Sequence, residues 1–390
     1  MKDNFIYFDN ASTTPLSKNV LEKINSTYQE YWFNPSSTYK SGIKCATYLE
    51  KLRCKIAEIF NADTEDIIFT SGSSESTSIV FSNIYEKFNN GRIVISNIEH
   101  QATIICANKL RRKNWEVYEW EVEQDGILNI SSINEILDKD TNLVSIIWAQ
   151  SEIGSIQPVQ AIGSKCKELK ILFHLDGTQI LSNGIFDWNN LNCDFLSLSA
   201  HKFGGPKGIG LLLTNKTSRL ILKNYDISLS QEYSIRQGTQ ALPLIAGMYE
   251  SIKNIKARIK LDEFKTEFIS NDIVLLRNYF FKKTKHNKNI KITGSKNQRL
   301  PNHISFILLN NKFKPIKAYK IINFMSEHNI AISSGSACSN ASGKPSSTLN
   351  NIGFNKEELY SNIRVSLSSI NNISEIDKFL KLIQECILIF

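Results

Sequence analysis

Short apolar runs alternate with stretches of helical periodicity, and this alternation restricts the possible folds more than any other feature of the chain. The strand-like runs occupy residues 67–70, 92–96, 143–149, 170–175, 195–198 and 208–213. Between residues 41 and 60, apolar residues recur every three or four positions, as in an amphipathic helix. Nearly continuous apolar strands separated by helices indicate a mostly parallel sheet with helices on both faces. We therefore predict an α/β fold.

The C-terminal part of the sequence predicts a second, smaller unit. The pattern from residue 242 to 278 is helical and long enough to bridge two units. Strands near 303–309, 330–333 and 363–367 indicate an α+β unit, to which the N-terminal strand at 5–8 could be joined. We predict a large domain of residues 15–255 and a small domain of residues 1–14 and 256–390.

Composition excludes several classes of protein. In 390 residues, 42% are hydrophobic, which suits well-filled cores, and no apolar run approaches the eighteen or so residues of a membrane span. The net charge of +8 is scattered and forms no basic stripe with interleaved aromatics, so nucleic-acid binding is not directly indicated. The seven cysteines are dispersed without a C-x-x-C pair, which favours neither a disulfide framework nor a metal site. We expect a soluble, cytoplasmic protein.

Polar residues follow several of the predicted strands. They are His100, Gln150 to Glu152, Asp176 with Gln179, and Ser199 to Lys202. Each could be an ordinary cap or turn residue. Ligands of parallel sheets bind beyond the carboxyl ends of the strands, so the repetition of this pattern predicts a binding site there.

Two of these positions suggest specific chemistry. Lys202 lies in a glycine-rich turn between two apolar strands, where desolvation would lower the pKa of an amine and suit it to Schiff-base formation; the alternative is a surface lysine. The hydroxyl-rich segment 71–77 opens a helix, whose free N–H groups could bind phosphate; the alternative is a plain N-cap. With Asp176 as a partner for a pyridinium nitrogen, these are the parts that a pyridoxal-phosphate (PLP) enzyme needs.

Ten stretches, in order, make the prediction more specific: YFDNASTTPL, WFNPSS, FTSGSSES, NIEHQA, SEIGSIQP, FHLDGTQ, SAHKFGGPKGIG, IRQGTQALP, SGSACSN and NIRVSLS. With them the chain resembles a cysteine desulfurase of the aminotransferase class V superfamily over nearly its whole length. Its long cysteine-bearing segment is similar to that of the iron-sulfur-assembly desulfurases. The resemblance implies a PLP-dependent aminotransferase of fold type I, with a mostly parallel seven-stranded sheet in the large domain and a smaller α+β domain.

The resemblance also implies roles for individual residues. Lys202 would anchor the cofactor aldehyde, Asp176 would contact the pyridine nitrogen and Gln179 the ring hydroxyl, while His100 would stack on the ring and assist proton transfer. Ser151 would lie near cofactor and substrate. Ser74, Ser199 and His201 would hold the phosphate, and Thr239 would reach the phosphate of the neighbouring subunit, which implies a homodimer. Arg364 would bind the substrate carboxylate, with Asn34 nearby.

Cys338 would be the nucleophile that removes sulfur from L-cysteine, leaving L-alanine and a persulfide for a sulfur-acceptor protein. It lies in the polar, glycine-containing segment 334–346, where a thiol stays accessible, whereas the other six cysteines fit small buried hydrophobes. Two alternatives stay open. The chain could be another class V enzyme, such as an aminotransferase or a selenocysteine lyase, or a weakly active PLP-binding subunit of a sulfur-transfer complex.

The match is incomplete at three places. Gln150-Ser151 stands where such desulfurases usually have Asn-Asn, and a serine cannot offer both functions of an amide. Residues 227–230 lack the usual glycines, and Ser73-Ser74 replaces Ala-Thr in the phosphate turn. These changes predict a specialised member whose substrate orientation differs.

Overall fold

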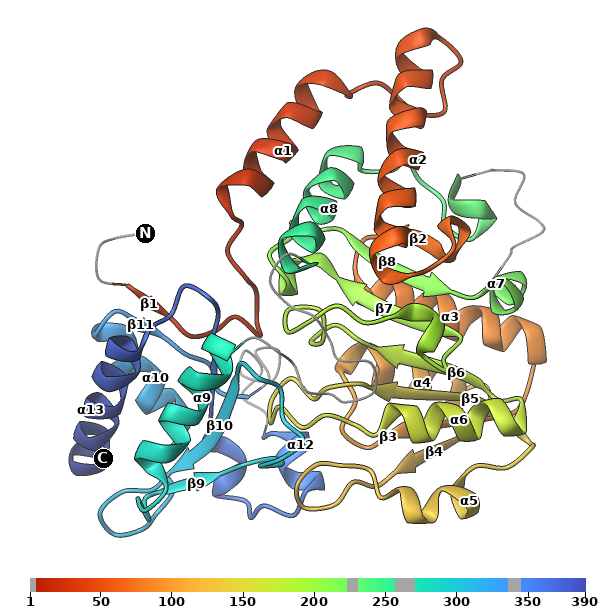
Figure 1. The fold of residues 1–390 in the computed structure, drawn as a ribbon. Helices are drawn as coiled ribbons and strands as arrows, with labels where there is room; N and C mark the ends of the chain where they lie inside the picture. Colours follow the sequence, from red (N-terminus) through yellow and green to blue (C-terminus); the bar gives the residue numbers. More distant parts are fainter. Residues whose placement is uncertain (1–4, 223–230, 257–270, 336–344) are drawn as a thin grey trace.

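A computed structural model describes residues 5–222, 231–256, 271–335 and 345–390. Its largest sheet has seven strands in the order β2-β8-β7-β6-β5-β3-β4 (Figure 1). Only β8 runs antiparallel to its neighbours; the pairs from β7 to β4 are all parallel. The strands are β2 (Ile67–Thr70), β3 (Arg92–Ser96), β4 (Glu116–Trp120), β5 (Thr141–Ile147), β6 (Leu172–Asp176), β7 (Phe195–Ser199) and β8 (Gly210–Thr214). The predicted mostly parallel, seven-stranded α/β sheet is confirmed.

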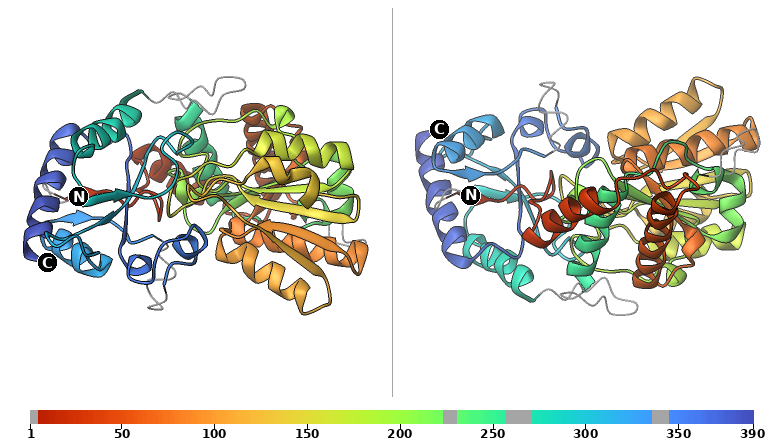
Figure 2. Two further views of the ribbon diagram at one scale, coloured as in Figure 1. Left: turned by 90° about the horizontal axis from the view of Figure 1, so that it is seen from below. Right: turned by 90° about the horizontal axis from the view of Figure 1, so that it is seen from above.

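Helices cover both faces of this sheet because its strands alternate large apolar side chains between the faces. Figure 2 shows helices on both sides of the sheet. Ile93 and Ile95 belong to one core cluster with residues of α3, α4 and α7, whereas Val94, between them, belongs to another with residues of α2, α6 and α8. The helices of this part are α1 (Lys18–Glu30), α2 (Lys40–Phe60), α3 (Ser73–Phe88), α4 (Gln101–Arg111), α5 (Ile133–Ile136), α6 (Val159–Leu169), α7 (Lys216–Leu222) and α8 (Leu242–Lys256).

The remaining strands form two small sheets around a second core. One is antiparallel, with the order β12-β10-β9, and in the other β1 pairs in parallel with β11, as predicted for the N-terminal strand. The rings of Phe280, Phe306 and Phe379 lie against one another in this core, with centroids 5.5 to 6.5 Å apart. Its elements are β1 (Ile6–Tyr7), α9 (Asn271–Thr284), β9 (Ile290–Ile292), β10 (His303–Leu308), α10 (Ala318–Glu327), β11 (Ile330–Ala331), α12 (Ser347–Asn351), β12 (Asn362–Ser366) and α13 (Ile373–Ile389).

Some predicted boundaries were displaced. The strand expected at 143–149 is β5, which ends at Ile147, and the one expected at 170–175 is β6, which starts at Leu172. Strand β4 was missed because it lies at the sheet edge and exposes most of its side chains, so it shows no apolar run. The helical pattern from 242 to 278 corresponds to α8 and α9, and residues 257–270 between them lie outside the described part. The domain boundaries at residues 15 and 255 stay a proposal.

Candidate active site

A cavity of about 580 Å³ lies at the carboxyl ends of the parallel strands. Residues 11–13 and Arg364 close its other side, so the seven-stranded sheet and the β12-β10-β9 sheet both contribute to its walls. Most of the predicted site residues line it: Ser74, His100, Ser151, Asp176, Gln179, Ser199, His201, Lys202 and Arg364. The strand-end pattern therefore located one common site.

Two of the predicted residues that the structure describes, Asn34 and Thr239, are not among those lining the cavity. Asn34 is exposed, and its side-chain oxygen accepts a hydrogen bond from the Ser36 backbone at 2.9 Å, which stabilises a local turn. Thr239 is also exposed. Cys338 lies outside the described residues. Within this chain, the structure therefore does not bring Asn34 or Thr239 to the other predicted residues.

The hydroxyl-rich turn forms one end of the cavity, as expected for an anion-binding site. Helix α3 begins there, and Ser71 to Glu75 all line the cavity. The first N–H groups of a helix have no partner within it and carry the positive end of its dipole. The turn lies directly against β8, since a Cβ on Gly210 would come 2.6 Å from the Cα of Gly72. Gly210 therefore lets the start of α3 pack this closely against the sheet.

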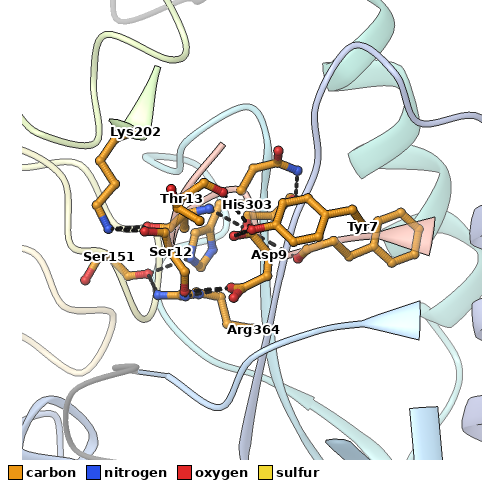
Figure 3. A network of polar contacts seen from close by, with 12 residues as sticks. Tyr7, Asp9, Ser12, Thr13, Ser151, Lys202, His303 and Arg364 are labelled. Carbon is orange, nitrogen blue, oxygen red and sulfur yellow. Dashed lines mark hydrogen bonds and ion pairs between the residues drawn. The ribbon is translucent and has the colours of Figure 1, made fainter. Parts of the chain in front are cut away.

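Lys202 and Arg364 approach the same N-terminal segment from two sides (Figure 3). The Lys202 amine donates to the carbonyls of Ala11 and Ser12, both at 2.8 Å. The Arg364 guanidinium donates to the Asp9 carboxylate at 2.8 Å and to the Ser12 hydroxyl at 2.5 Å. Residues 9–12 thus connect a lysine at the end of β7 to an arginine on β12.

Arg364 is held rigidly by the residues around it. Besides the contacts with Asp9 and Ser12, it donates to the carbonyl of Ser151 at 3.1 Å, and its side chain is only 3% exposed. The same carbonyl faces Nε2 of buried His303 at 3.2 Å. The remaining nitrogen of Arg364, Nε, is buried with no partner among the described residues. Arg364 is therefore a fixed, partly unsatisfied guanidinium in the cavity wall, suited to bind an anion.

The two histidines of the site have different environments. His100 caps α4, where its Nδ1 accepts from the Ala102 N–H at 3.1 Å, so a proton on the neutral ring is carried by Nε2. His201 contacts the Thr13 hydroxyl through Nδ1 at 3.2 Å. Burial, followed by the positive charges of Lys202 and Lys207, lowers the pKa of His201 to about 4. His201 is therefore neutral near pH 7 and can act as a hydrogen-bond donor without adding charge.

Asp176 is the last residue of β6, and Gln179 lies in the loop that follows. One carboxylate oxygen of Asp176 accepts from the Thr178 N–H at 3.0 Å. The Gln179 amide donates to the Ala11 carbonyl at 3.0 Å, which fixes the direction of its side-chain oxygen. The hydroxyl of Thr178 also lines the cavity and is buried without a partner among the described residues. Sequence reasoning missed Thr178, although it stands between the two predicted residues.

Glu99 is a second residue that sequence reasoning missed. One of its oxygens accepts from the Ser96 hydroxyl at 2.5 Å and from the Ile147 N–H at 2.7 Å, while the other is buried without a partner in the described chain. Burial, and then the nearby charge of Asp176, raise its pKa to about 8, although the hydrogen bonds act in the opposite direction. Glu99 is therefore neutral near pH 7 while lining the same cavity as Asp176. The sequence signal that could have identified Glu99 is its position next to His100 in the stretch NIEHQA.

Gln150 and Ser151 have separate tasks. Gln150 is buried, donates to the Thr348 hydroxyl at 2.9 Å, and accepts from the N–H groups of Glu152 and Ile153 at 2.5 and 3.1 Å. It therefore stabilises the turn after β5. Ser151 lines the cavity and orients Arg364 through its backbone carbonyl, a contact that does not depend on its side chain.

Comparisons with known proteins agree with this arrangement. The aminotransferase class-V model matches residues 6–379. The chain is 33% identical to a cysteine desulfurase, IscS, of Colwellia psychrerythraea, with 98% of this chain and 92% of that protein aligned. It is 31% identical to the mitochondrial cysteine desulfurase of Saccharomyces cerevisiae, with 97% of this chain and 74% of that protein aligned.

Solved structures show the same fold. A NifS-like protein superposes with a TM-score of 0.86 at 29% identity and covers 98% of this chain and 99% of its own. SspA in complex with cysteine superposes with a TM-score of 0.78 at 28% identity, covering 93% of this chain and 98% of its own. The chain therefore belongs to the aminotransferase class V family. Both relatives named above are cysteine desulfurases.

In the described part of the chain, no helix is both long and apolar enough to cross a membrane.

Proposed function

We propose that the protein is a PLP-dependent cysteine desulfurase that converts L-cysteine to L-alanine and leaves a persulfide on Cys338. The observation that carries this proposal is the meeting of Lys202, Arg364 and the start of α3 in one cavity, since an amine, a carboxylate-binding guanidinium and an anion site are all required there. The near-complete alignment with cysteine desulfurases supports it.

The residues present fit the cofactor. The start of α3 with Ser74, Ser199 and His201 would hold the phosphate. The Thr178 hydroxyl is buried and has no hydrogen-bond partner within the described part of the chain. Asp176 would contact the ring nitrogen, Gln179 the ring hydroxyl and His100 the ring face. Lys202 would bind the aldehyde. When bound, the cofactor would withdraw electrons from the α-carbon of the substrate and so acidify its proton.

The chain's own residues would then carry out the remaining steps. Arg364 would bind the substrate carboxylate through its unsatisfied side, with Ser151 orienting the guanidinium and Asn34 approaching from its exposed turn. Lys202 would move the α-proton, and the Nε2–H of His100 would serve as a proton donor. The Cys338 thiolate would attack the substrate sulfur, forming an S–S bond while the carbon–sulfur bond breaks and its electron pair returns to carbon.

We propose further that the protein acts as a homodimer in the cytoplasm, where thiols stay reduced, and that a sulfur-acceptor protein takes the persulfide. The exposed position of Thr239 supports a role outside its own chain, at the phosphate of a second copy. Large exposed hydrophobic residues occur on α1, at the start of α2 and in the segment between them, at Leu21, Tyr28, Trp32, Tyr39 and Ile43. Such a group of side chains is typical of an interface.

The test is incubation of the purified protein with L-cysteine and a reductant, with alanine and sulfide measured together. Equal amounts of both are expected, and Cys338→Ala should abolish both. Cys54→Ala is the matched control, because Cys54 is exposed and is not among the residues that line the cavity. Retained alanine formation in Cys338→Ala would favour another class V activity, and a protein that binds PLP without releasing sulfide would be a binding subunit only.

A further inference from the structure

The exposed turn that carries Thr239 has a backbone that requires support. It spans residues 231–240, and its exposed end consists of Gln237, Gly238 and Thr239. Just before this end, Glu232, Tyr233 and Ser234 have φ values of 43°, 56° and 65°. Each left-handed residue other than glycine costs about 1 kcal/mol or more, so three in succession persist only where the surroundings hold them.

A buried ion pair provides that support. Arg53, on α2, donates to both carboxylate oxygens of Glu232 at 2.8 Å, and the two side chains are 2% and 0% exposed. Arg53 also donates to the Ile67 carbonyl at 2.7 Å, and its guanidinium lies 4.5 Å from the ring centre of Phe69 and 5.2 Å from that of Tyr233. The pair therefore fastens the start of the turn to α2 and to the edge strand β2.

Further contacts close the turn at its other end. Glu232 accepts from the Phe69 N–H at 2.8 Å and from the Gln240 amide at 3.0 Å, and Gln231 accepts from the Gly238 N–H at 2.9 Å. All of these bonds fix the turn, yet none of them involves Thr239. The desolvation of a buried ion pair often costs as much free energy as the attraction returns. The main effect of the Arg53–Glu232 pair is therefore to fix the geometry of the exposed residues 237–239.

One more ion pair places the turn beside the anion-binding end of the cavity. Arg236 contacts Glu75 at 3.2 Å, and Glu75 lies in the first turn of α3 and lines the cavity. Burial raises the pKa of Glu75, but the hydrogen bond from the Ser71 N–H and the charge of Arg236 lower it by more, so this carboxylate stays charged. The turn therefore passes close to the phosphate end of its own chain, while Gln237 to Thr239 remain outside that cavity.

We propose that Arg53 and Glu232 are positioning residues that act in trans, by holding residues 231–240 so that Thr239 reaches the phosphate end of the cavity in a second copy of this chain. This inference rests on the proposed function, in which that cavity binds PLP. It predicts that loss of the pair weakens the site of the partner and leaves the site of the same chain intact.

The test uses mixed dimers, obtained by co-expressing two differently tagged chains and isolating the species that carries both tags. One chain carries Arg53→Met and Glu232→Met together, because removing one partner alone would leave a buried unpaired charge and could prevent folding. The other carries Lys202→Ala. In such a dimer, the site with an intact Lys202 receives its turn from the chain with an intact ion pair, so about half of wild-type turnover is expected.

The matched control pairs Lys202→Ala with Asp176→Ala. Both residues act within their own cavity, so each mixed dimer has two defective sites and no recovery is expected. Recovery with the Arg53/Glu232 chain but not with the Asp176 chain supports action in trans. Equal failure of both mixed dimers overturns it and assigns the pair to its own chain.

A second readout does not depend on turnover. In the homodimer of the Arg53→Met/Glu232→Met chain, affinity for PLP measured by absorbance titration should fall about tenfold, as for loss of one charge-assisted hydrogen bond. Affinity for pyridoxal, which has no phosphate, should not change. Equal loss for both ligands would indicate general damage, and no loss for either would show that the pair does not position Thr239. If the wild-type protein itself releases no alanine or sulfide, the proposed function fails independently of this result.

Discussion

Replacing Glu99 by glutamine should change how the stability of the protein depends on pH. In the unfolded chain a glutamate loses its proton near pH 4.5, whereas the buried Glu99 keeps it until about pH 8. Unfolding between these values therefore releases a proton, so the free energy of unfolding falls as pH rises. Each pH unit in this window is worth about 1.4 kcal/mol, which gives about 5 kcal/mol over the whole window. Glutamine has nearly the same shape and does not titrate.

The measurement is equilibrium urea unfolding of the cofactor-free protein at several pH values from 5 to 8, with wild type and Glu99→Gln compared at each. Other titrating groups are common to both proteins and cancel in the difference. Between pH 5 and pH 8, we expect the free energy of unfolding of Glu99→Gln to rise by about 4 kcal/mol relative to that of the wild type. Glu116→Gln is the matched control, since that side chain is 64% exposed at the sheet edge. Parallel stability curves for wild type and Glu99→Gln would refute the protonated carboxyl.

Three further predictions concern the walls of the same cavity. Gly210→Ala should push the start of α3 away from β8, destabilise the fold by about 1–3 kcal/mol and weaken PLP binding, as measured by urea unfolding and absorbance titration; unchanged binding would contradict the close approach. Arg364→Lys cannot reach Asp9, Ser12 and the Ser151 carbonyl together, so the KM for L-cysteine should rise about tenfold or more with a smaller change in kcat; an unchanged KM would remove Arg364 from carboxylate binding. The imidazole of His201, with a pKa of about 4, should remain neutral from pH 5 to 8 in an NMR titration assigned with His201→Gln, and a midpoint above pH 6 would count against its burial.

The central part of the fold could be predicted because its strands are buried on both faces. Residues 67–69 and 93–95 are apolar runs, and the structure forms β2 and β3 around them. The strand ends then located Asp176, Ser199 and Lys202 in a common cavity, since parallel strands present their carboxyl ends to one edge. β4 gave no such signal because its outer side chains face solvent.

Residues whose importance depends on contacts distant in sequence could not be predicted. Glu99 differs from any other glutamate only because the chain buries it against Ser96 and Ile147, and a sequence does not display that desolvation. In the same way, Arg53 lies at a buried position of α2, and the partner that neutralises its charge there, Glu232, is 179 positions away in the sequence. In the proposed homodimer Thr239 would act at a second copy of the chain, and one sequence contains no direct information about that contact.

The N-terminal segment makes formation of the cavity depend on the two small sheets as well as on the seven-stranded sheet. Asn10 and Ala11 are fixed by hydrogen bonds of 2.8 Å to the carbonyl and hydroxyl of Ser366, on β12, across more than 350 residues of sequence. Ala11 then accepts from both Lys202 and Gln179 through its carbonyl. Because β1 is a two-residue strand that pairs with β11, this segment has no independent stability and lies in place only when the smaller core has formed. The position of the Lys202 amine is therefore set partly by the small sheets. Mutations in the core around Phe306 and Phe379 should consequently change the geometry of the site by displacing residues 9–12.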